Sequence, residues 1–329
     1  MERRAGEVSD QTEPLAWWTD NLCCRTGASI RRTAHQDEGT GIVAARRGPT
    51  YLRVALGKEL RALRDQLGLT AEAVSVELGF SRSKISRVES GDIPLPKLID
   101  LERILDRYGV HDIDARDALL QMQRGSLSKE PFTSYTSLLP SGLPMYLGLE
   151  RDATRIRGYE NHVVHGLLQD ETYATALARS AKVVEERTTA FVEQGVRLRM
   201  ERKQLLTQPD GPEVHIILTE NALRTVIGSP EVMRAQYAEL KRLCALERVE
   251  VQIIPEDLAT YRSGWNFTVL EFTGLGPVTQ SDSAKATTMW SKESDVGQFQ
   301  RQFDAMAMAA PGPAQTPQIL DDLEKRLWK

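Results

Sequence analysis

The sequence predicts a multidomain protein in which a small all-α domain of five helices precedes a mixed α/β domain. Apolar residues between residues 51 and 125 recur every three or four positions, which is the period of an amphipathic helix. The runs EVHIIL and VEVQII, at residues 213–218 and 249–254, are rich in β-branched residues and are separated by a helical pattern, as in a sheet with crossover helices. At 329 residues the chain also exceeds the usual size of one domain.

Composition and charge are those of an ordinary globular protein, with 41% hydrophobic and 27% charged residues. No apolar run approaches the roughly 20 residues that span a bilayer, and the N-terminus lacks the basic-then-apolar order of a signal peptide. We therefore expect a cytoplasmic protein without a membrane partner. The 3 cysteines fit neither a disulfide framework nor a paired zinc motif, so no metal and no cofactor are expected.

Residues 1–50 are predicted to form a disordered N-terminal arm. They are rich in Arg, Gly, Thr, Ser and Asp, and no helical or strand period extends over more than a few residues. A short docking helix around Trp17 and Trp18 is the alternative, although an apolar cluster in a flexible segment explains the same residues.

The all-α domain, residues 51–125, begins with a helix predicted over residues 52–67. Its apolar stripe consists of Leu52, Leu56, Leu60, Leu63 and Leu67. The stretch from Leu69 to Gly91 then predicts two short helices joined by a tight turn at Gly79, with Thr70 capping the first and Ser81 capping the second. Two further helices are predicted over residues 97–108 and 113–124.

The second short helix presents basic and hydroxyl side chains on a face that the core does not use, and this is the pattern of a helix-turn-helix that reads double-stranded DNA. Arg82 and Arg87 can each form a bidentate contact with guanine, and Ser83 lies beside them. These three are the predicted base-contacting residues. The alternative is an ordinary surface helix whose charges are solvated.

Phosphate contacts are predicted for four further residues. Lys84 and Ser86 lie at the flank of the reading face, whereas Thr70 and Ala71 lie where free N–H groups begin a helix. From residue 51 to 91 the chain has seven basic and five acidic residues, a formal charge of +2, against −4 for the whole chain. The DNA-binding face is therefore a modest basic surface on an acidic body.

The stretch TAEAVSVELGFSRSKISRVESG closely resembles the XRE, or phage-repressor-like, helix-turn-helix family, whose five-helix domains read operators as dimers. The resemblance places Arg82, Ser83 and Arg87 where this family contacts bases. It also implies a structural ion pair between Arg64 and Glu89 under the recognition helix.

The chain departs from the XRE pattern at two places. Ala71 stands where the family often has Gln, so a phosphate contact by that side chain is lost. Val74 and Ser75 replace the usual Leu-Ala pair, which we expect to be a mild change in packing.

A linker rich in Gly, Ser, Thr and Pro is predicted over residues 126–144, followed by the α/β domain over residues 145–310 and a separate C-terminal helix within residues 311–329. Helices are predicted over residues 145–157, 184–206, 230–246, 295–309 and 316–328. Residues 166–180 are predicted to begin with a turn and to run into a further helix. Strands are predicted over residues 159–164, 213–218, 249–254, 266–272 and 277–281. The helix between the second and third of these strands suits a crossover between parallel strands.

Residues 145–309, with stretches such as YLGLERDATRIRGYENHVVHGLLQ and VEVQIIPED, resemble the C-terminal domain of the actinobacterial WhiJ-like or antitoxin-like XRE regulators. Members of this group are often encoded beside a small partner protein, so the resemblance implies such a partner. It supplies no enzymatic activity that could be transferred to this chain. Asp170 departs from the Thr usual after GLLQ, and the segment 281–290 departs from the strand-like segment expected there.

These patterns favour a sequence-specific transcriptional regulator, dimeric, that reads an operator with its third helix and is controlled through its C-terminal domain by a small protein or ligand. One alternative is an antitoxin-like interaction module with DNA binding secondary. Another is a catalytic unit with Glu220 as acid or base, although capping of a strand-to-helix turn explains Glu220 equally and no catalytic motif is present. His162 and His165 lack companion ligands, so we expect no metal site. Because no catalytic motif is present either, we do not expect an enzyme.

Overall fold

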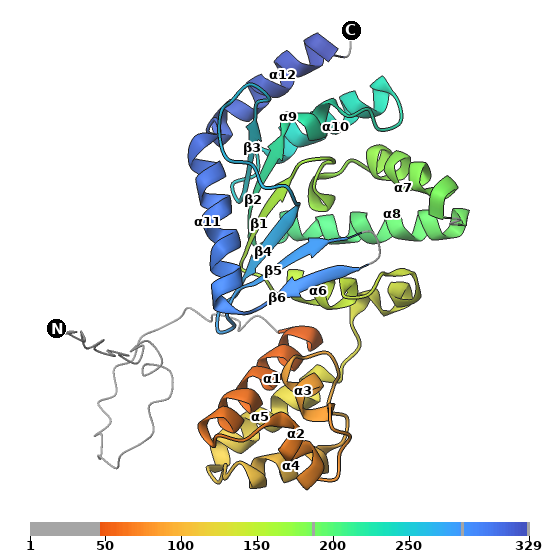
Figure 1. The fold of residues 1–329 in the computed structure, drawn as a ribbon. Coiled ribbons are helices and arrows are strands. Elements are labelled where there is room, and N and C mark those ends of the chain that lie inside the picture. The colour runs from red at the N-terminus through yellow and green to blue at the C-terminus, as the bar shows by residue number, and fades with distance from the viewer. Residues whose placement is uncertain (1–46, 186–187, 284–285, 328–329) are drawn as a thin grey trace, which may run out of the picture. The chain divides into compact units, whose positions relative to one another are not determined.

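The first helix begins earlier than the sequence predicted. The computed structural model describes residues 47–185, 188–283 and 286–327 (Figure 1), and the predicted disordered arm lies outside these ranges up to residue 46. Helix α1 spans Pro49–Gln66, with Pro49 in the first turn, where its missing N–H is not needed. Residues 47–50 are therefore part of the folded chain and not of the arm.

Five helices form the all-α domain, as predicted. Helix α1 is followed by α2 (Ala71–Glu77), α3 (Lys84–Glu89), α4 (Leu98–Arg107) and α5 (Ile113–Ser126). Leu60, Val74, Ile85 and Leu101 are buried in one apolar core. Thr70 caps α2, because its hydroxyl oxygen accepts the N–H of Ala73 at 3.1 Å.

The start of α3 differs from the prediction. The helix begins at Lys84, and its N-cap position is Ser83, whose side chain makes no capping hydrogen bond. Ser81 was predicted to cap the helix, but it lies in the turn before it, where its carbonyl accepts the N–H of Lys84 at 2.9 Å. Arg82 and Ser83 therefore lie in the turn that leads into α3.

The C-terminal domain is built on one six-stranded mixed sheet (Figure 1), in the order β3-β2-β1-β4-β5-β6. The strands are β1 (Arg155–Glu160), β2 (Glu213–Thr219), β3 (Val249–Ile254), β4 (Phe267–Glu271), β5 (Val278–Asp282) and β6 (Thr287–Trp290). Strands β1, β2 and β3 are parallel, whereas β4, β5 and β6 are antiparallel to their neighbours. The predicted crossover between parallel strands β2 and β3 is thus confirmed.

Helices cover both faces of this sheet. The α-helices after α5 are α6 (Leu143–Glu150), α7 (Glu171–Glu185), α8 (Thr189–Lys203), α9 (Glu220–Arg224), α10 (Pro230–Leu243), α11 (Glu293–Ala309) and α12 (Thr316–Leu327). The 3-10 helices are η2 (Pro131–Leu138), η3 (Gly166–Leu168), η4 (Gln204–Thr207) and η5 (Pro313–Gln315). Neighbouring residues of β2 point to opposite faces, so that Ile216 joins the main core, while Ile217 packs with Phe303 of α11 on the other face.

Several predicted bounds in this domain are wrong. The strand predicted over residues 159–164 is β1, which begins four residues earlier and ends at Glu160. The helix predicted over residues 145–157 ends at Glu150, because Ile156 already belongs to strand β1, where its side chain is buried in the main core. The helix predicted over residues 184–206 begins only at Thr189, since Thr188 caps it by accepting the N–H of Phe191 at 3.1 Å. The segment 281–290, predicted to depart from a strand, contains the end of β5 and all of β6.

The predicted linker, residues 126–144, is folded rather than extended. Phe132 of η2 is buried in the main core, and the Ser141 carbonyl, two residues before the start of α6, accepts the N–H of Thr287 at 2.9 Å. The Gly, Ser and Pro residues of this segment therefore form turns between packed elements. Among the described residues, no helix is long and apolar enough to cross a membrane.

Helix α12 is an integral part of the C-terminal domain. Leu320 and Leu323 are buried in the main core, and the ammonium of Lys241 on α10 lies 3.0 Å from the carboxylate of Glu324. The hydroxyl of Thr316 also donates to the carbonyl of Val251 in β3. Residues 311–327 therefore complete the domain that was predicted to end at residue 310.

Replacing Leu320 by Ala should destabilise the C-terminal domain by about 2–5 kcal/mol, because it opens a cavity in the main core. Urea unfolding followed by circular dichroism measures the loss. The exposed Gln318→Ala on the same helix is the control and should change stability by less than about 0.5 kcal/mol. Equal effects of the two substitutions would show that α12 is not part of the core.

Candidate nucleic-acid interface

The three predicted base-contacting side chains lie together on the outside of the helix-turn-helix. Arg82, Ser83 and Arg87 are all exposed, and the N–H of Arg87 bonds the carbonyl of Ser83 at 3.0 Å, one helical turn away. On the opposite side of α3, Ile85 and Val88 are buried in the domain core. The amphipathic pattern of α3 thus leaves its polar face free for a ligand.

The two arginines of this face differ in their surroundings. Arg82 Nη1 lies 3.2 Å from Glu72 Oε1 of α2, and their side chains are 83% and 61% exposed. An exposed pair of this kind stabilises by at most about 1 kcal/mol, so a guanine or a phosphate can replace Glu72. Within the part of the chain that the structure describes, the Arg87 guanidinium has no hydrogen-bond or ion-pair partner.

The predicted phosphate-contacting residues are not equivalent in the structure. Ser86 is exposed at the edge of the α3 face, and Thr70 and Ala71 lie at the start of α2, where the hydroxyl oxygen of Thr70 already caps the helix. The fourth residue, Lys84, is turned toward α4. Its ammonium lies 2.6 Å from Asp100 Oδ2, and its side chain is only 23% exposed.

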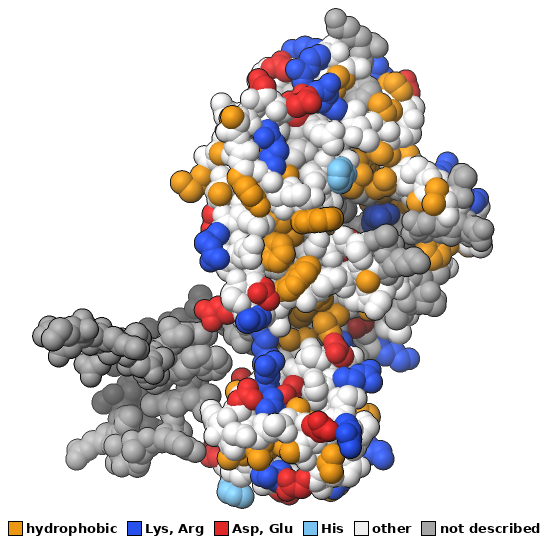
Figure 2. Space-filling model, in the orientation of Figure 1, with side chains coloured by type: hydrophobic (Ala, Val, Ile, Leu, Met, Phe, Trp, Pro, Cys, Tyr) orange, Lys and Arg blue, Asp and Glu red, His pale blue; other side chains and the backbone are white. Residues whose placement is uncertain are grey.

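Lys84 also covers the ring of Phe80, with its ammonium 3.7 Å from the ring centroid. A phosphate contact by Lys84 would thus require the ammonium to leave both an anion and an aromatic face. In Figure 2, acidic and basic side chains are mixed over the visible face of the helices α1 to α5, and no single basic patch covers it. This agrees with the small formal charge of the region.

A buried ion pair holds α3 against α1. Arg64 Nε and Nη2 donate to the two carboxylate oxygens of Glu89 at 2.7 and 2.8 Å, and Nη1 donates to the Leu69 carbonyl at 2.6 Å. The hydrogen bonds to Glu89 raise the pKa of Arg64 above its usual value. The pair that the XRE resemblance implies is present, and it joins α1, the turn before α2 and the end of α3.

Ser75 provides a second link under the reading face. Its hydroxyl donates to the carbonyl of Ala71 at 2.8 Å and accepts the N–H of Ile85 at 3.2 Å. This N–H lies in the first turn of α3, where helical N–H groups have no partner within the helix. The change from the usual Ala, expected to be a mild packing change, thus supplies a hydrogen bond that ties α2 to α3.

Gly57 is a structural residue that the sequence reading missed. A Cβ at this position of α1 would lie 2.5 Å from the carbonyl oxygen of Val88 and 2.6 Å from that of Glu89. Only glycine therefore allows α1 to approach the end of α3 this closely. A single Gly inside a strong leucine stripe is the signal that could have revealed it.

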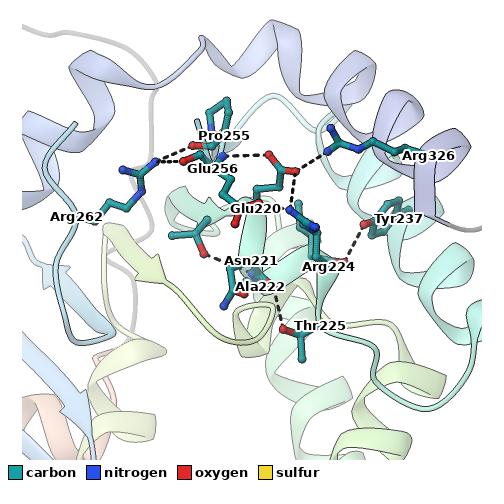
Figure 3. A network of polar contacts seen from close by, with 12 residues as sticks. Glu220, Asn221, Ala222, Arg224, Thr225, Tyr237, Pro255, Glu256, Arg262 and Arg326 are labelled. Carbon is teal, nitrogen blue, oxygen red and sulfur yellow. Dashed lines mark hydrogen bonds and ion pairs between the residues drawn. The ribbon is translucent and has the colours of Figure 1, made fainter. Parts of the chain in front are cut away.

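Glu220, the candidate acid or base, is held in a network of polar contacts (Figure 3). One carboxylate oxygen accepts the backbone N–H of Glu256 at 3.0 Å, and the other accepts the guanidinium of Arg326 on α12. Thr219 caps α9 by accepting the N–H of Ala222 at 3.3 Å. The network joins the ends of β2 and β3 to α12, which gives Glu220 a structural role.

The two candidate histidines do not form a metal site in the structure. His162 is exposed, whereas His165 is buried and its Nδ1 accepts the N–H of Leu167 at 3.3 Å. Burial lowers the pKa of His165 to about 4, so the imidazole is neutral at neutral pH. No group of three or more His, Cys, Asp or Glu side chains suited to a metal ion occurs within the described ranges.

Comparison with known proteins identifies two families. Residues 143–322 match the family described as "Domain of unknown function (DUF5753)", and residues 55–119 match the helix-turn-helix domain family, which confirms the predicted helix-turn-helix. A Pyrococcus horikoshii protein named "Putative HTH-type transcriptional regulatory protein PH1808" is 33% identical over 92 residues. These cover 27% of this chain and 28% of that protein. No solved structure matches the chain.

Replacing Glu89 by Leu should destabilise the all-α domain by about 3–5 kcal/mol, because the buried guanidinium of Arg64 loses both bonds to Glu89 and keeps only the half-exposed Asp65 as a carboxylate partner. Urea unfolding of the full chain measures this loss. The control is Arg61→Ala, which breaks an exposed pair with Asp65 at 3.6 Å and should cost no more than about 1 kcal/mol. A similar, small cost for both substitutions would contradict a scaffold role for Glu89.

Replacing Ser75 by Ala should cost about 1–3 kcal/mol, because the N–H of Ile85 then stays buried without an acceptor. Hydrogen exchange at that amide provides the local measurement, and it should become faster than in the unchanged chain. Ser86→Ala, on the exposed face of the neighbouring helix, is the matched control and should leave this exchange rate unchanged. An unchanged rate in Ser75→Ala would refute the link.

Proposed function

This chain belongs to the family of the domain of unknown function DUF5753, and from that premise, together with its helix-turn-helix domain, we propose that it is a DNA-binding transcriptional regulator. The observation that carries the proposal is the exposed face formed by Arg82, Ser83 and Arg87. A buried ion pair fixes the backbone beneath this face, so that its side chains meet a ligand in a set geometry.

In the proposed complex, α3 lies in the major groove of double-stranded DNA. Arg82 and Arg87 contact guanine O6 and N7, and Ser83 reads a neighbouring base edge. Ser86, Thr70 and the backbone of Ala71 contact phosphates and set the register of the helix. Lys84, which the sequence also placed on a phosphate, is here assigned to the scaffold because Asp100 holds its ammonium.

We further propose that the regulator acts as a homodimer. The formal charge of +2 over residues 51–91 limits the electrostatic attraction that one copy can exert on DNA, so one copy should bind weakly. Two copies would read the two half-sites of an operator. The C-terminal domain would hold the copies together and receive a signal from a ligand or from a small protein encoded nearby.

No catalytic step is part of the proposal. The only acid or base singled out from the sequence, Glu220, is 8% exposed and has both carboxylate oxygens engaged by Glu256 and Arg326. To act on a substrate, Glu220 would first have to break these contacts. A structural role for the network is therefore the simpler account.

Replacing Arg82 or Arg87 by Ala should weaken binding to the preferred DNA by about 1–3 kcal/mol and relax base preference at one or two positions. The preferred DNA is first enriched from a random duplex library by the unchanged chain, and affinity is then measured by fluorescence anisotropy at fixed salt. Arg197→Ala, an exposed arginine of α8, is the matched control for charge and should leave base preference unchanged.

The enrichment itself can contradict the proposal. A library that yields no preferred sequence at moderate salt would show that the chain does not read an operator. A preferred sequence whose base preferences survive in both the Arg82 and the Arg87 variants would show that α3 does not make the contacts assigned to it.

A further inference from the structure

Helix α1 belongs to two apolar cores at once. Its later residues Leu56 and Leu60 are buried in the core of the all-α domain. Its earlier residues Tyr51 and Val54 are buried in the main core of the C-terminal domain. Residues of both domains thus pack on one continuous helix of 18 residues. The described residues from Arg47 onward accordingly belong to one compact unit.

The first turn of α1 is capped by carboxylates that are remote in sequence. Its N-cap residue is Gly48, which has no side chain to satisfy the free N–H groups. The N–H of Gly48 instead lies 3.0 Å from both carboxylate oxygens of Asp152, just after α6. The N–H and the hydroxyl of Thr50 both donate to Glu130, at 2.8 and 2.6 Å. Negative charge at this end also suits the helix dipole.

Packing around this turn leaves little freedom. The Tyr51 hydroxyl donates to the carbonyl of Thr273 after β4 at 2.7 Å, and its ring meets that of Phe272 edge-on at 5.9 Å. On the other side, a Cβ on Gly148 of α6 would lie only 2.4 Å from the hydroxyl of Thr50. The start of α1 therefore cannot slide or turn without breaking contacts with the C-terminal domain.

The later part of α1 is fixed to the recognition helix α3 by hydrogen bonds and close packing. Arg53 Nε donates to the carbonyl of Gly91 after α3 at 2.6 Å, and Gly57 touches the last carbonyls of α3. About two turns further on, Arg64 makes its buried pair with Glu89. The same rigid helix thus contacts the C-terminal domain at one end and α3 along the rest of its length.

We propose that this arrangement, in which Asp152 and Glu130 clamp the first turn of α1, couples the C-terminal domain to the recognition helix. A ligand or partner that draws either carboxylate away would release α1, and the reading face would lose its fixed orientation. With the clamp in place, the positions of the two reading faces in a dimer are set by the C-terminal domains. This inference rests on the proposed function, and it adds a way in which the C-terminal domain could control DNA binding.

The first test separates the clamp from the rest of the fold. In the full chain, Asp152→Ala with Glu130→Ala should speed hydrogen exchange in the first turn of α1 about tenfold, the effect expected for loss of a helix cap. Exchange in α3 and in the sheet should stay the same. The control is Asp257→Ala with Glu247→Ala, two exposed carboxylates of the same domain, which should change nothing. Unchanged exchange in the clamp variant would overturn the proposal.

A third substitution separates capping from coupling. In the unchanged chain, a Cβ on Gly48 would lie 2.5 Å from Asp152 Oδ2, but Asp152→Ala makes room for it. Adding Gly48→Ser to the clamp variant supplies a local cap, and it should bring exchange in α1 back to within about threefold of the original rate. Calorimetry should nevertheless show two unfolding transitions in place of one, because the hydrogen bonds from α1 to Asp152 and Glu130 remain absent. A single transition would overturn the coupling.

The DNA measurement distinguishes this inference from the proposed function. The probe is the two-half-site duplex enriched by the unchanged chain, compared with one whose half-sites are moved apart by about five base pairs, half a helical turn. In the unchanged chain, the ratio of the affinities for these two duplexes measures how strictly the spacing is fixed. In the clamp variant, Asp152→Ala with Glu130→Ala, this ratio should fall about tenfold, while the base preferences at each half-site stay the same. If the preference stays intact, the coupling is refuted. If exchange and calorimetry behave as expected but no DNA is bound, only the proposed function fails.

Discussion

The buried pair between Arg64 and Glu89 is the interaction on which the reading face depends. Removing two charges from water is costly, and the cost is offset only when every donor and acceptor is satisfied. Here the guanidinium meets both carboxylate oxygens and the Leu69 carbonyl. Few arrangements of α1 and α3 fulfil all these bonds at once. The pair therefore specifies the position of α3 more sharply than apolar packing alone could.

The same constraint extends through α1 to the C-terminal domain. Because Gly57 brings α1 into contact with the carbonyls that end α3, and Tyr51 lies in the other core, neither domain can shift without straining the helix between them. An unfolded linker would have allowed the two domains to move independently. The segment after α5 is folded instead, and its Glu130 bonds Thr50 at the start of α1. The two domains are thus joined by packing as well as by the chain.

Local patterns in the sequence were sufficient for most elements but not for their ends. The leucine stripe of α1 and the β-branched runs of β2 and β3 follow directly from burial. Both strands and the end of α1 were therefore predicted almost to the residue. The start of α1 was missed because its caps are supplied by Asp152, 104 residues away. Likewise Ser81 and Ser83 are equally suited to capping by residue type, and only the folded turn decides between them.

Side-chain partners that are distant in sequence also change what the basic residues can do. Counting charges treats Lys84 as equal to Arg82 and Arg87, but Asp100 of α4 already neutralises its ammonium. The reading face then depends on two arginines, and one of these, Arg82, forms an ion pair with Glu72. In the proposed complex both arginines contact bases, and the groups that contact phosphates are uncharged. Each copy therefore neutralises few phosphates, and its binding to DNA should depend only weakly on salt. Useful affinity would then have to come from base contacts and from the pairing of two copies. Regulation would therefore act mainly on how the C-terminal domains hold the two copies together.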